Sequence, residues 1–140
     1  MHTSVAWQDT MYVFGGLAPT MQPKADLFVL NLQEWTWRHL GQVTVEGQPV
    51  KASGHSAGVY EGKMLVFGGT DMETAVYNSL FVYDFAGHWG KAADSLRPRF
   101  GGGMAVDETV RLVGGIDLLS KEMCQTVDTA NLQSIEWLQP

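Results

Sequence analysis

The chain repeats one pattern three times, and no other feature of the sequence limits its fold as strongly. An apolar run that ends in a pair of glycines occurs at residues 11–16, 64–69 and 110–115. The glycine pairs are offset by 53 and then by 46 residues. A repeat of about 20 to 50 residues is typical of an array of one supersecondary unit, so the chain should fold as three similar units in a row.

Each repeat also contains runs that match before and after its glycine pair. Before the pair, the matching stretches are residues 2–7, 55–60 and 101–106. After it, residues 27–31, 80–84 and 127–131 lead to Trp37, Trp89 and Trp137, respectively. Short runs rich in Val, Phe, Tyr and Leu and bounded by Gly, Asp or Asn are typical of strands. We therefore expect four short strands per repeat, named A to D in chain order, with the glycine pair at the end of strand B.

Strand B is apolar at consecutive positions rather than at every second one. Residues 64–67 read Met-Leu-Val-Phe, and such a strand must be covered on both faces. A sheet that lies between two neighbouring sheets meets this requirement. Four-stranded sheets stacked face to face around an axis form a β-propeller, in which each sheet is one blade.

With this glycine pair, these strands and a tryptophan at this period, the sequence resembles the kelch-repeat family of β-propellers. The resemblance covers essentially the whole chain and implies an all-β fold with blades of four antiparallel strands. The chain would be a single kelch-repeat domain, residues 1–140, whose three blades form an open arc. We expect the blades at about residues 1–50, 51–96 and 97–140.

Residues that recur with the repeat are expected to be structural. The glycine pairs end a buried strand where the backbone turns sharply, and glycine reaches positive φ without steric cost. His2 and His55 occupy the same place in successive repeats, which favours a hydrogen-bonded structural role over metal binding. The three tryptophans are expected to pack between blades.

The third repeat departs from this pattern at several positions. Gly101 replaces the histidine. Arg111 stands where the other repeats have tyrosine and leucine, and Asp128 replaces a phenylalanine. A charge at a buried position is unfavourable unless it is paired or exposed. Either this face is open to solvent, or Arg111 and Asp128 form an ion pair across the strands, and we expect the pair.

The loops that follow the B strands and the linkers between blades should emerge on one face, because strand direction alternates. Long loops on a rigid scaffold are where binding residues concentrate. The candidate contacts in these loops are Lys24, Thr70, Asp71, Met72, Arg97, Arg99 and Asp117. Met21 and Met123 add adaptable apolar contacts. Arg97 and Arg99 are the favoured contacts, and the alternative for both is that they are ordinary solvated arginines.

Kelch propellers generally hold peptides or protein surfaces, so the resemblance implies a protein-binding module that serves as an adaptor or substrate-recognition part. A propeller enzyme resembling galactose oxidase is the alternative. Its copper site would need clustered His and Tyr and a modified Cys, whereas Cys124 has no histidine near it in the sequence. A glycosidase would need two convergent carboxylates. We therefore expect no catalytic residue, metal ligand or cofactor, and a purely structural scaffold stays open.

Composition narrows the choice of partner and compartment. The net charge of −6 comes without a basic cluster, which argues against nucleic acid. No apolar run approaches the roughly 18 residues that span a membrane. One cysteine and no N-glycosylation sequon favour a reducing compartment, the cytoplasm.

Three blades leave an incomplete ring, because propellers close with about four to eight blades. Two blade faces would be bare, and exposed apolar faces favour association. We expect the chain to be either a fragment of a longer protein or a homodimer in which two copies join head to tail into one ring.

Overall fold

A computed structural model of the chain describes residues 1–45, 48–73, 76–93, 97–132 and 135–137. These residues form strands joined by turns and loops, and no helix occurs in the described ranges. Accordingly, these ranges contain no helix that is long and apolar enough to cross a membrane.

Three antiparallel sheets make up the body of the fold. The first runs in the order β1 (His2–Trp7), β2 (Thr10–Gly15), β3 (Asp26–Asn31) and β4 (Thr36–Gln42). The second runs β7 (Ser53–Tyr60), β8 (Lys63–Thr70), β9 (Leu80–Tyr83), β10 (Trp89–Ala93) and β16 (Glu136–Trp137). The third runs β12 (Gly103–Val106), β13 (Thr109–Val113) and β15 (Asp128–Asn131). Two short pairs lie in the linkers and loops: β5 (Thr44–Val45) with β6 (Gln48–Pro49), and β11 (Arg99–Phe100) with β14 (Ile116–Asp117).

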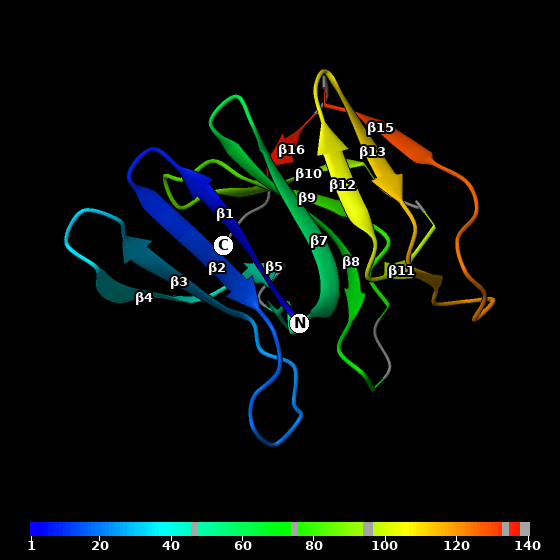
Figure 1. Ribbon diagram of the computed structural model, residues 1–140, viewed down its shortest axis with the longest axis horizontal. Coiled ribbons are helices and arrows are strands. Elements are labelled where there is room, and N and C mark those ends of the chain that lie inside the picture. Colours follow the sequence, from blue (N-terminus) through cyan, green and yellow to red (C-terminus); the bar gives the residue numbers. More distant parts are fainter. Residues whose placement is uncertain (46–47, 74–75, 94–96, 133–134, 138–140) are drawn as a thin grey trace.

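The three sheets are the three blades and stand side by side in an open arc, with β1, β7 and β12 next to one another (Figure 1). Backbone hydrogen bonds join successive blades near the start of these strands: Gly54 N donates to Met1 O (3.4 Å), and Gly101 N donates to Gly54 O (2.6 Å). The all-β prediction and the open arc of antiparallel blades are confirmed.

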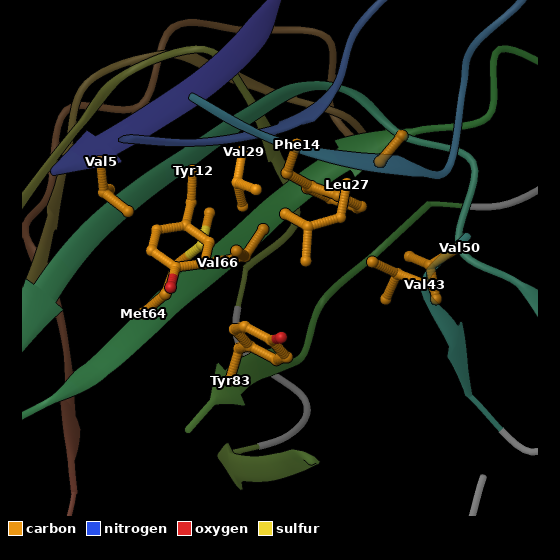
Figure 2. Close-up of a cluster of buried hydrophobic side chains, with 11 residues drawn as sticks. Val5, Tyr12, Phe14, Leu27, Val29, Val43, Val50, Met64, Val66 and Tyr83 are labelled. Atoms are coloured by element: carbon orange, nitrogen blue, oxygen red, sulfur yellow. The ribbon is translucent and has the colours of Figure 1, made fainter. Parts of the chain in front are cut away.

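Apolar side chains fill the space between neighbouring blades. Between the first two blades, Tyr12 and Phe14 of β2 belong to the same buried cluster as Met64 and Val66 of β8 (Figure 2). Between the second and third blades, Leu65 and Phe67 of β8 pack with the β13 side chains of a second cluster. Because burial of apolar area is the main favourable term in folding, these two interfaces hold the arc together.

Strand β8 is therefore covered on both faces, as its sequence predicts. Met64, Leu65, Val66 and Phe67 are all buried, and none is more than 4% exposed. Alternate residues point to opposite faces of a strand, so the first and third of these face blade 1 and the other two face blade 3.

The glycine pair is needed where the linker between blades crosses the end of strand B. Gly68 has φ +82°, and a Cβ at this position would lie 2.7 Å from the carbonyl oxygen of Arg99. Gly15, with φ +69°, has the same relation to the carbonyl oxygen of Ala52. Both the backbone conformation and the close approach exclude a side chain, which confirms the structural interpretation of these glycines.

The strand around the third tryptophan lies in another sheet than predicted. β16 pairs with β10 of the middle blade, with Trp137 opposite Gly90 and Glu136 opposite Lys91. Gly90 leaves room for the indole, since a Cβ there would lie 2.9 Å from a ring carbon of Trp137. The expected four strands per blade are therefore found in the first blade, whereas the middle blade has five and the described part of the third has three.

The prediction that all three tryptophans pack between blades is correct only for Trp89. Its ring centroid lies 6.1 Å from that of Phe14 in the preceding blade. Trp37 and Trp137 are 58% and 46% exposed, respectively. No blade among the residues that the structure describes lies against the face of blade 1 that carries Trp37, and Trp137 lies on the outermost strand of its sheet.

The histidines of the first two repeats also differ from each other. His55 is buried, and its Nε2 lies 3.1 Å from the carbonyl oxygen of Phe14. Because that oxygen can only accept, Nε2 carries the proton. Burial lowers the pKa of His55 to about 4. The structural role expected for this position is confirmed for His55, whereas His2 is exposed.

In the third blade, the predicted position of the missing histidine is wrong by one residue. His55 lies opposite Gly68, whereas Gly103 lies opposite Val113, so Gly102 rather than Gly101 takes the place of the histidine. The reason is that the hairpin of strands A and B is one residue shorter in the third blade when it is counted from the histidine position to the first glycine of the pair, 12 residues (102 to 114) against 13 (55 to 68).

The predicted ion pair between Arg111 and Asp128 is also wrong. Arg111 is half-exposed and donates to Asp107 at 2.9 Å. Asp128 instead accepts a hydrogen bond from Arg99 at 2.6 Å. Of the two alternatives for Arg111, exposure to solvent is therefore correct, because no blade formed by the described residues covers that side of β13.

Candidate protein-binding surface

The loops that follow the B strands emerge at the same end of the arc (Figure 1). An isolated β-bridge narrows each loop, between Leu17 and Pro23, Thr70 and Val76, and Ile116 and Met123. The surface formed by these loops and by the linkers between blades is called the loop face below. Bridged loops on packed sheets hold their side chains in place before a partner arrives, which reduces the entropy lost on binding.

Each loop of the loop face carries one strongly exposed methionine. Met21, Met72 and Met123 are 63%, 52% and 63% exposed. The first two have φ of +65° and +64°, so they occupy left-handed positions at the turns of their loops. Exposed methionine is a flexible apolar contact that adapts to differently shaped partners.

Thr70 and Asp71 shape the second loop. Thr70 Oγ1 accepts a hydrogen bond from Met72 N at 3.0 Å, and Asp71 Oδ1 accepts one from Glu73 N at 2.9 Å. These bonds form turns in which a side chain mimics the backbone. The two residues therefore position Met72, whatever further contacts they make.

A hollow of about 590 Å³ brings two of the predicted contacts together. It is lined by Arg97 from the linker between blades 2 and 3 and by Glu122, Met123, Gln125 and Thr126 from the third loop. Arg97 is 49% exposed. Glu122, Gln125 and Thr126 were not among the predicted contacts, although Glu122 and Gln125 lie within the loop that was expected to bind a partner.

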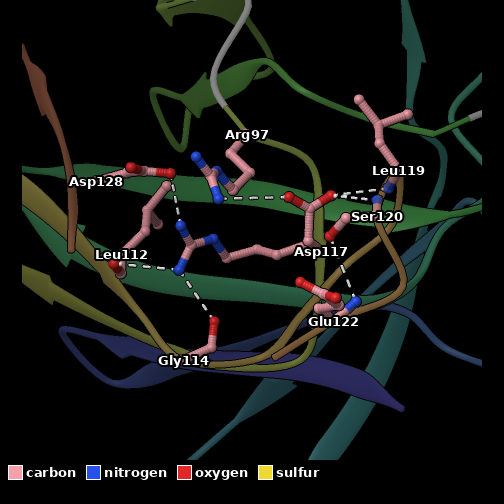
Figure 3. A network of polar contacts seen from close by, with 9 residues as sticks. Arg97, Leu112, Gly114, Asp117, Leu119, Ser120, Glu122 and Asp128 are labelled. Carbon is pink, nitrogen blue, oxygen red and sulfur yellow. Dashed lines mark hydrogen bonds and ion pairs between the residues drawn. The ribbon is translucent and has the colours of Figure 1, made fainter. Parts of the chain in front are cut away.

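Asp117 supports this hollow from inside the loop. Its Oδ1 accepts hydrogen bonds from Leu119 N (2.8 Å) and Ser120 N (3.1 Å), and its Oδ2 lies 3.6 Å from Arg97 Nη1 (Figure 3). These backbone donors, together with the nearby guanidinium, hold the pKa of Asp117 below its usual value. Asp117 is buried, so it fixes the loop rather than presenting its carboxylate to a partner.

Arg99, one of the favoured contacts, lies inside the protein. It is 1% exposed, and its Nη1 donates to the carbonyl oxygens of Leu112 (3.2 Å) and Gly114 (2.9 Å). Its Nη2 donates to Asp128. Arg99 therefore joins the linker to blade 3 and is not available on the loop face. Ala52, which holds the same place before the middle blade, is also buried. An alignment of Arg99 with Ala52 in the repeat would therefore have predicted that Arg99 is buried.

Lys24 lies apart from the hollow, in the loop of the first blade. It is 50% exposed, and its Nζ lies 3.7 Å from Asp26 Oδ2. Lys24 and Arg97 are thus separate cations of the loop face, which also carries the exposed Lys51 in a linker and Lys121 in the third loop. Among the residues that the structure describes, no three His, Cys, Asp or Glu side chains gather so as to hold a metal ion.

Known proteins share this sequence pattern and fold. Acyl-CoA-binding domain-containing protein 4 of Arabidopsis thaliana is 31% identical over 134 residues, which cover 91% of this chain and 19% of that protein. Tip elongation aberrant protein 1 of Schizosaccharomyces pombe is 31% identical over 141 residues, covering 91% of this chain and 12% of that protein. The chain thus spans only a small part of these relatives.

A solved structure, that of YjhT, matches with a TM-score of 0.74 and 18% identity over 97% of this chain and 50% of that chain. At this identity, the likeness shows the fold alone. The KLHDC2/KLHL20/DRC7 Kelch-repeats domain matches residues 1–140. Domains of this kind generally act as protein-interaction modules. The chain belongs to the KLHDC2/KLHL20/DRC7 Kelch-repeats family.

Proposed function

We propose that the chain recognises a peptide or protein surface through its loop face, as the recognition part of an adaptor in the cytoplasm. The observation that supports this most directly is the hollow that combines Arg97 with Met123. It offers a cation and an adaptable apolar surface side by side, which suits a peptide carrying an acidic residue next to an apolar one.

The guanidinium of Arg97 has N–H groups that can donate hydrogen bonds to such a partner. Its Nη1 is 3.6 Å from Asp117, whereas a charge-assisted hydrogen bond measures about 2.7 to 2.9 Å. A partner carboxylate could therefore form a shorter, bidentate contact with the guanidinium. Met21 and Met72 of the other loops, together with Lys24, would extend the contact across the arc.

A displayed library of random peptides, selected on the purified chain, tests this proposal. Enriched peptides should bind the chain with an affinity that falls about tenfold, about 1.4 kcal/mol, in Arg97→Glu. Met123→Ala should weaken them less. Lys63→Glu is the matched control, since Lys63 begins β8 at the opposite, short-turn end of the middle blade. Peptides that respond to Lys63 and not to Arg97 or Met123 would contradict the loop face as the binding surface.

A further inference from the structure

The outer edge of the middle blade shows what the outermost strand of a blade can bind. β10 would be the last strand of that sheet, yet β16 adds to it as a fifth strand. Glu136 lies opposite Lys91, so the added strand brings an acidic residue to a basic one. The addition thus follows the rule that opposite charges on facing strand positions stabilise a sheet.

The equivalent edge of the first blade carries no such strand. β4 is the last strand of its sheet in the described part of the chain. Arg38 of β4 lies opposite Val29, just as Gly90 lies opposite Val82 in the middle blade. An edge strand exposes a row of backbone N–H and C=O groups that can pair with a further strand.

Two hollows lie along the side of β4 that faces the middle blade. One, of about 290 Å³, is polar and lined by Arg38 and Thr36 together with Thr10, Tyr12, Val29 and Asn31. The other, of about 190 Å³, has walls that include Leu40, Tyr83 and Trp89. Among the described residues, the exposed Arg38 guanidinium forms no hydrogen bond or ion pair, so its charge is uncompensated.

Thr36 and Arg38 alternate along β4 and share one face; the register of β4 shifts between His39 and Gln42, and Leu40, which lies there, lines the hollow on the same side. A strand added at this edge would place two residues of its own opposite Arg38 and Leu40, two positions apart and about 7 Å from each other. An acidic side chain fits the position opposite Arg38. A bulky apolar side chain opposite Leu40 reaches toward the hollow that is lined by Tyr83 and Trp89.

We propose that the edge of β4 is a second binding site, which takes an extended peptide segment of a partner as an additional strand. The segment carries an acidic residue opposite Arg38 and a bulky apolar residue two positions along, opposite Leu40. The pairing of β16 with β10 shows the same addition within this molecule. The site lies at the edge of the first blade, where β4 leads into the first linker, and is separate from the hollow lined by Arg97 and Met123 between blades 2 and 3; neither site depends on the other.

The probe is a fluorescent peptide of about ten residues that alternates Thr and Val and carries one Glu and one Phe two positions apart. Its matched control has Lys in place of Glu. Fluorescence anisotropy should show saturable binding of the Glu peptide, weakened about tenfold in Arg38→Glu. The Lys peptide should recover that affinity in Arg38→Glu. Hydrogen exchange should show new protection in residues 36–42 on binding.

Arg97→Glu separates this site from the loop face, because it should leave binding of this probe unchanged. An absence of saturable binding would overturn the β4 site. So would equal affinities of the Glu and Lys peptides for the unmodified chain, or protection that falls on the loops instead of on β4. Each of these results leaves the loop face to be judged by its own peptides.

Discussion

Strand B of the middle blade and strand B of the third blade differ in how their side chains are covered. In β8, all four central side chains are buried. In β13, Val110 and Leu112 are fully buried, whereas Val113 is 48% exposed and Arg111 reaches solvent. The middle strand has a neighbouring blade on each side, whereas the third has a neighbour on one side only in the described part of the chain.

This difference shows that the repeated sequence pattern determines where a strand forms, whereas the blades next to a strand determine which of its side chains are buried. A strand covered on both faces is apolar throughout, and one covered on a single face alternates. Arg111 follows this rule directly, since it occupies the open face of β13. Asp128 does not lie on that face: it is one half of an internal ion pair with Arg99.

The largest effect should come from truncating equivalent side chains on the two strands. Phe67→Ala should lower the free energy of unfolding by about 3 to 5 kcal/mol, because Phe67 is 1% exposed and leaves a cavity. Val113→Ala, at the same place in the third repeat, should cost less than about 1 kcal/mol. Urea unfolding measures both. Similar losses would mean that the open face of β13 is covered in solution.

The next effect concerns the ion pair that the third blade has and the middle blade lacks. Arg99→Met should lower the free energy of unfolding by about 3 kcal/mol, the low end for a broken buried pair, because methionine keeps the apolar stem. The same substitution at the half-exposed Arg97 should cost less than about 1 kcal/mol.

The double variant Arg99→Met/Asp128→Leu tests whether the loss comes from an abandoned charge. It should recover part of the stability, since no carboxylate is then left facing the buried site. If the double variant is as unstable as Arg99→Met, the loss comes from the hydrogen bonds to Leu112 and Gly114 and not from the abandoned carboxylate. If Arg99→Met unfolds like the unmodified chain, Arg99 does not join blade 3 to the linker.

The fold class could be predicted from the sequence because its signals are local. The glycine pair, the apolar B strand and the tryptophan recur at a fixed spacing, and each reports on its own strand. The failures arose where the structure depends on distant residues. The shorter hairpin of blade 3 moved Gly102 into the histidine position, and the place of β16 depends on the room that Gly90 leaves.

The candidate site was predicted in part for the same reason. Exposure of Met72 and Met123 follows from their place in long loops. The burial of Arg99 does not, because its partner Asp128 lies 29 residues away and the carbonyl groups that it meets belong to strand ends. That Arg97 and Met123 line one hollow also required the packing of blade 3 against the linker.

A third test uses pH, because His55 of the middle blade corresponds to a glycine in the third. The folded-state pKa of His55 is about 4 against 6.5 for the free side chain, so the unfolded chain binds the proton more readily. Its stabilising contribution is complete above pH 6.5 and is lost as the pH falls toward the folded pKa. The free energy of unfolding should drop by about 2 kcal/mol between about pH 6.5 and about pH 5.

Urea unfolding across this range, with His55→Gln as the control, measures the effect. The variant should be less stable at neutral pH and should show a shallower pH dependence than the unmodified chain. Equal slopes for the two proteins would show that His55 is protonated as easily in the folded state as in the unfolded state.

The smallest effect on stability is expected from making the third blade resemble the middle one. Arg111→Leu installs the residue that stands at the equivalent position in β8. With no blade on that face, the leucine gains little burial, and loss of the exposed pair with Asp107 costs less than about 1 kcal/mol. The added apolar surface should instead promote association, which light scattering detects. If Arg111→Leu stabilises the chain by more than about 1 kcal/mol and leaves its molecular mass unchanged, another copy or another blade already covers this face, as a head-to-tail homodimer would require.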